Sequence, residues 1–238
     1  MKTVLNLIVK LLSNTIGQWH LPYINKKFPI EDYFKIEEYI RGLSNPFVVG
    51  AVRTHGNGSN LLIGLAQCFS PTKKCFRVTH VLAHIGIFGG FRHRVVESLG
   101  PGIREVPLLQ AIGQRDDVVL RKPNPRLLND EVCKHAIEYI QEVAIRDSFK
   151  NIDYDTVHDY SIITLEELKD YSNNNIHLDC SETIMQALEH GFKMTGQKSL
   201  VKMVDRVGKK TWTPAELYHS ELFITFYDSK EGFIDGDL

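Results

Sequence analysis

The sequence lacks several features that would narrow its class at once. Its 238 residues contain no apolar run near the ~20 residues that a membrane-spanning helix needs. Its charges nearly cancel, with 28 lysines and arginines against 29 aspartates and glutamates, so no global basicity points to nucleic acid. It contains no internal repeat and no low-complexity tract. These absences argue against a membrane-spanning protein, a nucleic-acid-binding protein and a repeat protein.

Cysteine is also scarce, which bears on the redox compartment. The four thiols are Cys68, Cys75, Cys133 and Cys180, and no two of them form a C-x-x-C pair. Hydrophobic residues make up 43% of the chain, enough for a sizeable core without disulfide staples. We therefore expect reduced thiols, with a Cys68–Cys75 bridge as the less favoured alternative. Nothing in the composition calls for a cofactor.

The N-terminal part differs from the rest of the chain. A lysine followed by apolar residues resembles the start of a signal peptide, but Lys10 interrupts the run and no small-residue cleavage site follows. We expect instead an amphipathic helix near residues 4–12 and a second over 30–42, which together make a helical extension over 1–44. Without a convincing signal peptide we expect cytoplasmic synthesis, and the final site is left open, a phage particle included.

Short strands come first and longer helices later between residues 45 and 238. Expected strands lie within 45–55, 75–88, 93–98, 103–108 and 116–123, with a last one near 222–228. Expected helices lie within 128–147, 178–191 and 213–219. The pattern predicts an α+β class, with an antiparallel sheet packed against helices.

Cys180 has the setting that a catalytic cysteine needs. The sequence LDCSETIMQALEHGF predicts a helix with Cys180 in its first turn, a cap at Asp179 and an end at Gly191. N–H groups at a helix N-terminus lower the pKa of a thiol and can hold the oxyanion of a tetrahedral intermediate. The alternative is a small buried hydrophobic residue, which is how we interpret the other three cysteines.

The base that would activate Cys180 is expected on a neighbouring strand. His80 and His84 lie on one face of the strand THVLAHIG. Glu97 closes the return strand of a hairpin, where its carboxylate would fix the tautomer of an imidazole. A tight turn at the two glycines of this hairpin would put Glu97 near His84, and a wider loop would put it near His80.

The same residues suggest a rival use as zinc ligands. His80, His84 and Glu97 supply the nitrogen and oxygen donors that zinc takes in proteins. The H-E-x-x-H signature, however, needs a glutamate after the first histidine, where this chain has Val81, and it needs a helix. Glycines and β-branched neighbours favour a strand here, so we predict no metal site.

Six short motifs occur in the order typical of a known family. They are VVGAVRTHGNGSNLLIG, THVLAHIG, RVVESLGPGIREVPL, DYD at 153–155, DCSET at 179–183 and WTPAEL at 212–217. With these motifs, over roughly residues 45–228, the chain resembles the circularly permuted papain-like amidases, relatives of the NlpC-type cell-wall peptidases. The resemblance implies a permuted papain-like cysteine hydrolase fold over 45–238, in which the histidine strand precedes the cysteine helix.

The resemblance also implies roles for individual residues. Cys180 matches the nucleophile, His80 or His84 the base, and Glu97 the group that orients the base. Thr79 directly before it favours His80, whereas the short spacing to Glu97 favours His84. Four further residues match family positions beside the cleft and are expected to bind substrate: Tyr154, Asp155, Ser181 and Glu182. The loop before the histidine strand is long for the family, and the first 44 residues have no counterpart in it.

The leading hypothesis is therefore a hydrolase, a cysteine peptidase or amidase that works through an acyl-enzyme on Cys180. The expected partner is a peptide, a peptidoglycan fragment or an acyl-lipid, with no nucleic acid and no transmembrane segment. Two other classes stay open. An acyltransferase would pass the acyl group to an amine or alcohol instead of water. A non-catalytic binding or structural module, of the kind found in phage particles, would use the same fold without turnover.

Overall fold

The fold is α+β, as the sequence predicts. The computed structural model describes residues 28–53, 79–88, 92–99, 102–113, 115–148, 152–153, 163–170, 172, 176–198 and 213–234. The helices are α2 (Ile30–Gly42), α4 (Leu108–Ile112), α5 (Asp130–Ser148), α6 (Leu165–Lys169), α7 (Cys180–Met194) and α9 (Pro214–His219). The strands are β1 (Val49–Arg53), β2 (His80–Phe88), β3 (Arg92–Leu99), β4 (Gly102–Pro107), β5 (Asp117–Pro123), β6 (Ile152–Asp153), β7 (Ile176–His177), β8 (Phe223–Asp228) and β9 (Gly232–Phe233).

One antiparallel sheet organises the described part of the chain. Its strand order is β4-β3-β2-β1-β5-β8-β9, and each pair of neighbours runs antiparallel. The strand expected within 103–108 is β4, which lies at one end of this order. Strands β6 and β7 form a separate parallel pair. Among the helices that the structure describes, none is long and apolar enough to cross a lipid bilayer.

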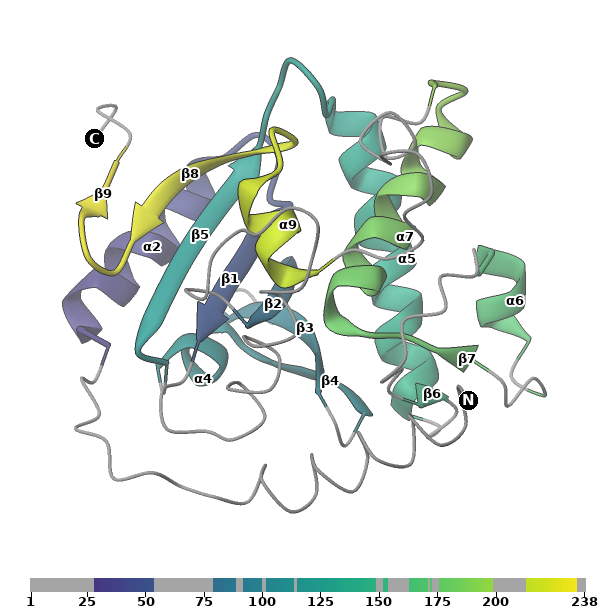
Figure 1. Ribbon diagram of the computed structural model, residues 1–238, viewed down its shortest axis with the longest axis horizontal. Coiled ribbons are helices and arrows are strands. Elements are labelled where there is room, and N and C mark those ends of the chain that lie inside the picture. The colour runs from purple at the N-terminus through teal and green to yellow at the C-terminus, as the bar shows by residue number, and fades with distance from the viewer. Residues whose placement is uncertain are drawn as a thin grey trace, which may run out of the picture.

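Helices cover both faces of the sheet, and alternation along β2 decides which residues meet which helices. Val81, Ala83 and Ile85 belong to the core shared with α5 and α7. Leu82 belongs to a second core, which includes Ile36 of α2. Figure 1 shows α5 and α7 on one side of the sheet and α2 on the other. The alternation predicted from the sequence of β2 is confirmed, and it places the two strand histidines on the α2 side.

A β-bulge sets the register of the hairpin that carries Glu97. From Phe88↔Arg92 the pairs of β2 and β3 step regularly, until the register shifts between His84 and Gly86. Gly86 takes a φ of 126°, which glycine adopts at little cost. The shift puts Glu97 opposite Leu82. Without it Glu97 would lie opposite Ala83 and face the other core, because a slip of one residue exchanges the two faces.

Helix α7 ends later than the sequence predicted. Gly191 was expected to close it, but the helix continues to Met194 and is capped by Thr195. The glycine serves close packing instead. A Cβ at Gly191 would lie 2.3 Å from the carbonyl oxygen of Val132 in α5. The expected helix end is therefore wrong, because the missing side chain lets α5 and α7 approach and does not mark a turn.

Two buried arginines fasten short helices to the rest of the fold. Arg146 of α5 donates to the carbonyl oxygens of Glu167 (3.1 Å) and Asp170 (2.8 Å) and also to that of Leu168, at the C-terminus of α6. Arg121 of β5 does the same for carbonyls in the last turn of α9 and in the segment that follows it. A cation at a helix C-terminus satisfies carbonyls that have no partner within the helix.

Candidate functional site

Cys180 is the first residue of α7, as predicted. Asp179 is the N-cap, and its carboxylate accepts from the backbone N–H of Glu182 at 2.7 Å. The Glu182 carboxylate accepts in turn from the backbone N–H of Asp179 at 3.2 Å, which completes a capping box. Ser181 donates its hydroxyl to the same Asp179 carboxylate at 2.9 Å. The cap therefore fixes where the first turn begins and where Cys180 lies.

The first turn of α7 meets the sheet where β2 and β3 stop pairing. The last register pair is Leu82↔Glu97, so Val81 and Ser98 would form the next one. The α7 segment contacts both residues instead. The backbone N–H of Val81 donates to the Cys180 thiol, and the Ser98 hydroxyl donates to the Leu178 carbonyl at 3.0 Å. Cys180 thus lies at the backbone of Val81, whose side chain faces α7, whereas the side chain of the preceding His80 is on the α2 side of the strand.

His80 is held by Glu97 at the same end of the strand. Its Nε2 lies 3.0 Å from Oε2 of Glu97, and both side chains are buried. An ionised carboxylate only accepts, so Nε2 carries the hydrogen and Nδ1 carries the lone pair in the neutral ring. Of the two positions that the hairpin allowed for Glu97, the structure shows the one beside His80.

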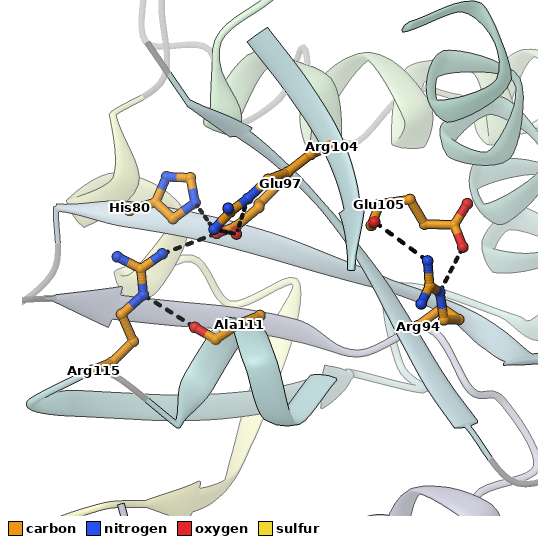
Figure 2. A network of polar contacts seen from close by, with 7 residues as sticks. All are labelled: His80, Arg94, Glu97, Arg104, Glu105, Ala111 and Arg115. Atoms are coloured by element: carbon orange, nitrogen blue, oxygen red, sulfur yellow. Dashed lines mark hydrogen bonds and ion pairs between the residues drawn. The ribbon is translucent and has the colours of Figure 1, made fainter. Parts of the chain in front are cut away.

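Glu97 is surrounded by positive groups. Arg104 of β4 donates to Oε1 from Nε at 2.8 Å and from Nη2 at 2.5 Å. Arg115, just before β5, donates from Nη2 to Oε2 at 3.0 Å. Figure 2 shows all three partners converging on the one carboxylate. Burial alone would raise the pKa of Glu97, but His80 and the two guanidinium groups together lower it to about 2.

His84 lies in a separate buried pair, away from this network. Its Nδ1 is 2.6 Å from the Pro46 carbonyl oxygen, and its Nε2 is 3.1 Å from Nδ1 of His93. Because the carbonyl fixes the hydrogen on Nδ1, the His84 Nε2 accepts from His93. Burial, followed by the neighbouring His93, lowers the pKa of His84 to about 4 despite the carbonyl contact. Four residues along a strand separate it from His80 by about 13 Å.

The thiol of Cys180 does not have the lowered pKa that its helical position predicted. The side chain is 5% exposed, and burial is the largest influence on it. Burial and the nearby charge of Asp179 raise the pKa of the Cys180 thiol. The N–H groups of Val81 and of the first turn of α7 act in the opposite direction but are outweighed. Desolvation here exceeds the stabilisation of a thiolate by the helix N-terminus.

The remaining predicted residues divide into two groups. Ser181 and Glu182 are buried and make the cap contacts described above, so these contacts give both a structural role. Tyr154 and Asp155 lie outside the described residues, as do Cys68 and Cys75. The other two cysteines, Cys133 and Cys180, are free thiols. Burial raises the pKa of Cys133 in α5 to about 12.

Two residues of the site were not predicted. Arg104 lies directly opposite Glu97 in the β3–β4 ladder. The LGPG turn, which pairs Leu99 with Gly102, fixes this register, so the sequence did contain a signal for Arg104. Arg115 reaches Glu97 from the segment after α4, and no local pattern predicts that. Among the described residues, no three histidine, cysteine, aspartate or glutamate side chains gather as a metal site would require.

Comparisons with known proteins do not place the chain in a family. No family model, no curated protein and no solved structure matches it.

Proposed function

We propose that the protein is a cysteine hydrolase that cleaves an amide or peptide bond through an acyl-enzyme on Cys180. The observation that carries the proposal is the meeting of α7 and β2. There the thiol at a helix N-terminus accepts the N–H of Val81, directly after a histidine that a buried glutamate orients. Thiol, imidazole and carboxylate from three separate elements are the parts of a catalytic triad.

In this proposal His80, not His84, is the base. His84 uses both ring nitrogens within its own pair, to the Pro46 carbonyl and to His93. His80 uses Nε2 for Glu97 and presents Nδ1 as the proton acceptor. Glu97 keeps this tautomer and stabilises the imidazolium that forms when the proton arrives.

The thiol reacts by general-base catalysis. A buried thiol with a raised pKa rests in its protonated form, so the proton leaves as the sulfur attacks the carbonyl carbon. The S–C bond forms while the proton passes to Nδ1 of His80, which in this proposal reaches the thiol past the end of β2, beside the Val81 N–H. The C–N bond then breaks and the leaving amine takes that proton. Water, deprotonated by the same nitrogen, hydrolyses the thioester, which releases the acid and restores the thiol.

The backbone at the start of α7 supplies the oxyanion site. The N–H groups of Cys180 and Ser181 lie in this first turn and act to lower the pKa of the thiol. N–H groups at the positive end of a helix stabilise a tetrahedral oxyanion. The substrate in this proposal is a cell-wall peptide, another amide or an acyl-lipid. The order of strand histidine before helix cysteine supports the permuted papain-like arrangement that the sequence motifs suggest.

A second candidate is a binding or structural module without turnover. The burial of Cys180 and the raised pKa of its thiol favour it, because an inert core cysteine has the same two properties. The buried ion pairs of Glu97 would then serve only to fix the hairpin.

Hydrolysis assays separate the two candidates. The wild-type chain is incubated with peptidoglycan fragments, with peptide amides and with acyl-lipids, and products are identified by mass spectrometry. We expect turnover of one class, abolished by Cys180→Ala and unchanged by Cys133→Ala, the matched buried thiol. Full activity in Cys180→Ala would refute the proposal, and tight binding without turnover would favour the second candidate.

A further inference from the structure

We propose that Arg104 and Arg115 are positioning residues, which hold the Glu97 carboxylate against His80 and offset its charge. This inference deepens the proposed function, on which it rests. It assigns the orientation and the basicity of His80 to three side chains, Glu97, Arg104 and Arg115, and not to Glu97 alone.

The contacts of Glu97 leave it little freedom. Arg104 binds Oε1 through two nitrogens, and Arg115 binds Oε2, the oxygen that also accepts from His80. The Glu97 side chain is fully buried, whereas those of Arg104 and Arg115 are 46% and 15% exposed. A buried carboxylate with cations on both oxygens is fixed in position as well as in charge.

The three partners come from different parts of the chain. His80 is on β2, Arg104 is on β4, and Arg115 follows α4, which gives a further hydrogen bond from Arg115 Nε to the Ala111 carbonyl at 3.0 Å. Figure 2 shows Arg104 and Arg115 reaching Glu97 from different elements. The position of Glu97 is therefore set by the whole end of the sheet.

The charges also act on His80 directly. Burial lowers the pKa of His80, and Glu97 opposes that effect. Arg115 and Arg104 lower the pKa again, because each positive charge disfavours an imidazolium nearby. With one negative and two positive neighbours the imidazole is neutral at rest, the form in which a base can accept a proton. Cys180 of α7, at the Val81 backbone of β2, adds no charge, because its raised pKa keeps the thiol protonated.

The same pair of strands offers a matched control. Arg94 of β3 pairs with Glu105 of β4, with Nε 2.7 Å from Oε1. This pair appears beside the Glu97 network in Figure 2 and has the same chemistry. No dashed line in Figure 2 joins Arg94 or Glu105 to Glu97 or His80. Arg94→Gln therefore removes an arginine–glutamate bridge from the β3–β4 ladder while Glu97 keeps its partners.

The test is the titration of the His80 ring, which is monitored by long-range proton–nitrogen NMR. The His80 signals are assigned by their absence in His80→Gln. We expect Arg104→Gln to raise the pKa of His80 by about half a unit to one unit, since a partly exposed positive charge on the carboxylate that binds the ring is lost. Arg104→Lys restores the charge and should return most of that shift. Arg94→Gln should produce less than half of it.

Equal shifts in Arg104→Gln and Arg94→Gln, or no shift in either, would overturn the inference. The titration is read on the folded protein whether or not it hydrolyses a substrate. A chain that shows the expected shifts but no hydrolysis would refute the proposed function and keep the assignment of Arg104. In an active chain, the acid limb of the rate against pH should move up by the same shift in Arg104→Gln.

Discussion

Acidification from pH 7 to pH 4 should destabilise this protein through its buried histidines. His80, His84 and His93 are all buried, and burial is the largest cause that lowers the pKa of each. His84 is the clearest case, because its pKa falls from 6.5 to about 4. Its Nδ1 hydrogen bonds the Pro46 carbonyl and its Nε2 accepts from His93, so the folded site has no place for a second proton.

The sign and size of the effect follow from linkage. A folded pKa below the unfolded value means that the unfolded chain takes up the proton first as the pH falls. Stability that is present above pH 6.5 is therefore lost between 6.5 and about 4. Two and a half units at about 1.4 kcal/mol each give about 3 kcal/mol for His84, a large part of the stability of an ordinary domain.

Glu97 acts in a different range of pH and does not obscure this effect. Its pKa is lowered from 4.5 to about 2, so its contribution is present above pH 4.5 and is lost as the pH falls through 2. The loss between pH 6.5 and 4.5 thus belongs to histidine.

The assay is urea unfolding at a series of pH values between 7 and 4. We expect the free energy of unfolding to fall by about 3 kcal/mol or more in the wild type. The fall should be clearly smaller in His84→Gln and undiminished in His135→Gln, the control on the outer side of α5. A wild-type stability that is flat down to pH 4.5, or an equal fall in His84→Gln, would refute the reasoning.

Three further predictions concern packing and thiol chemistry. Arg146→Met should lower the free energy of unfolding by about 3 kcal/mol, since it removes the hydrogen-bond donor of three carbonyls at the C-terminal end of α6. A loss below about 1 kcal/mol in urea unfolding would contradict this. Gly191→Ala should cost about 2 kcal/mol against the Val132 carbonyl, whereas Gly42→Ala, with open space around it, should change stability by less than about 0.5 kcal/mol; equal effects would argue against close helix contact. Iodoacetamide should label Cys180 slowly in the native protein at neutral pH, because its buried thiol is protonated; rapid labelling, read by mass spectrometry, would instead indicate a resting thiolate.

Local sequence patterns predicted most of the elements because each carries its own signal. Alternation in THVLAHIG gave the two faces of β2, and Asn129 caps α5 through its side chain at 2.9 Å from the N–H of Val132. The capped helix that begins at Cys180 was predicted for the same reason. The end of α7 was not predicted, because Gly191 is needed for close contact with the neighbouring helix α5 and does not end its own helix.

The candidate site was predicted only in part, because its geometry depends on register and burial. The hairpin sequence left Glu97 beside either histidine, and the bulge near Gly86 selects His80. The helix N-terminus suggested a lowered thiol pKa, but the desolvation that raises the pKa of Cys180 comes from tertiary packing. Arg115 belongs to the site through tertiary packing alone.

The most direct test of the proposed function is to identify the residue that a small acyl donor acylates. The protein is treated with p-nitrophenyl acetate, a small acyl donor, and the acetylated residue is identified by peptide mass spectrometry in the wild type, Cys180→Ala, Cys133→Ala and His80→Gln. We expect a thioester on Cys180 that also forms in Cys133→Ala and is lost in His80→Gln. Acetylation that avoids Cys180, or that proceeds equally well without His80, would contradict it.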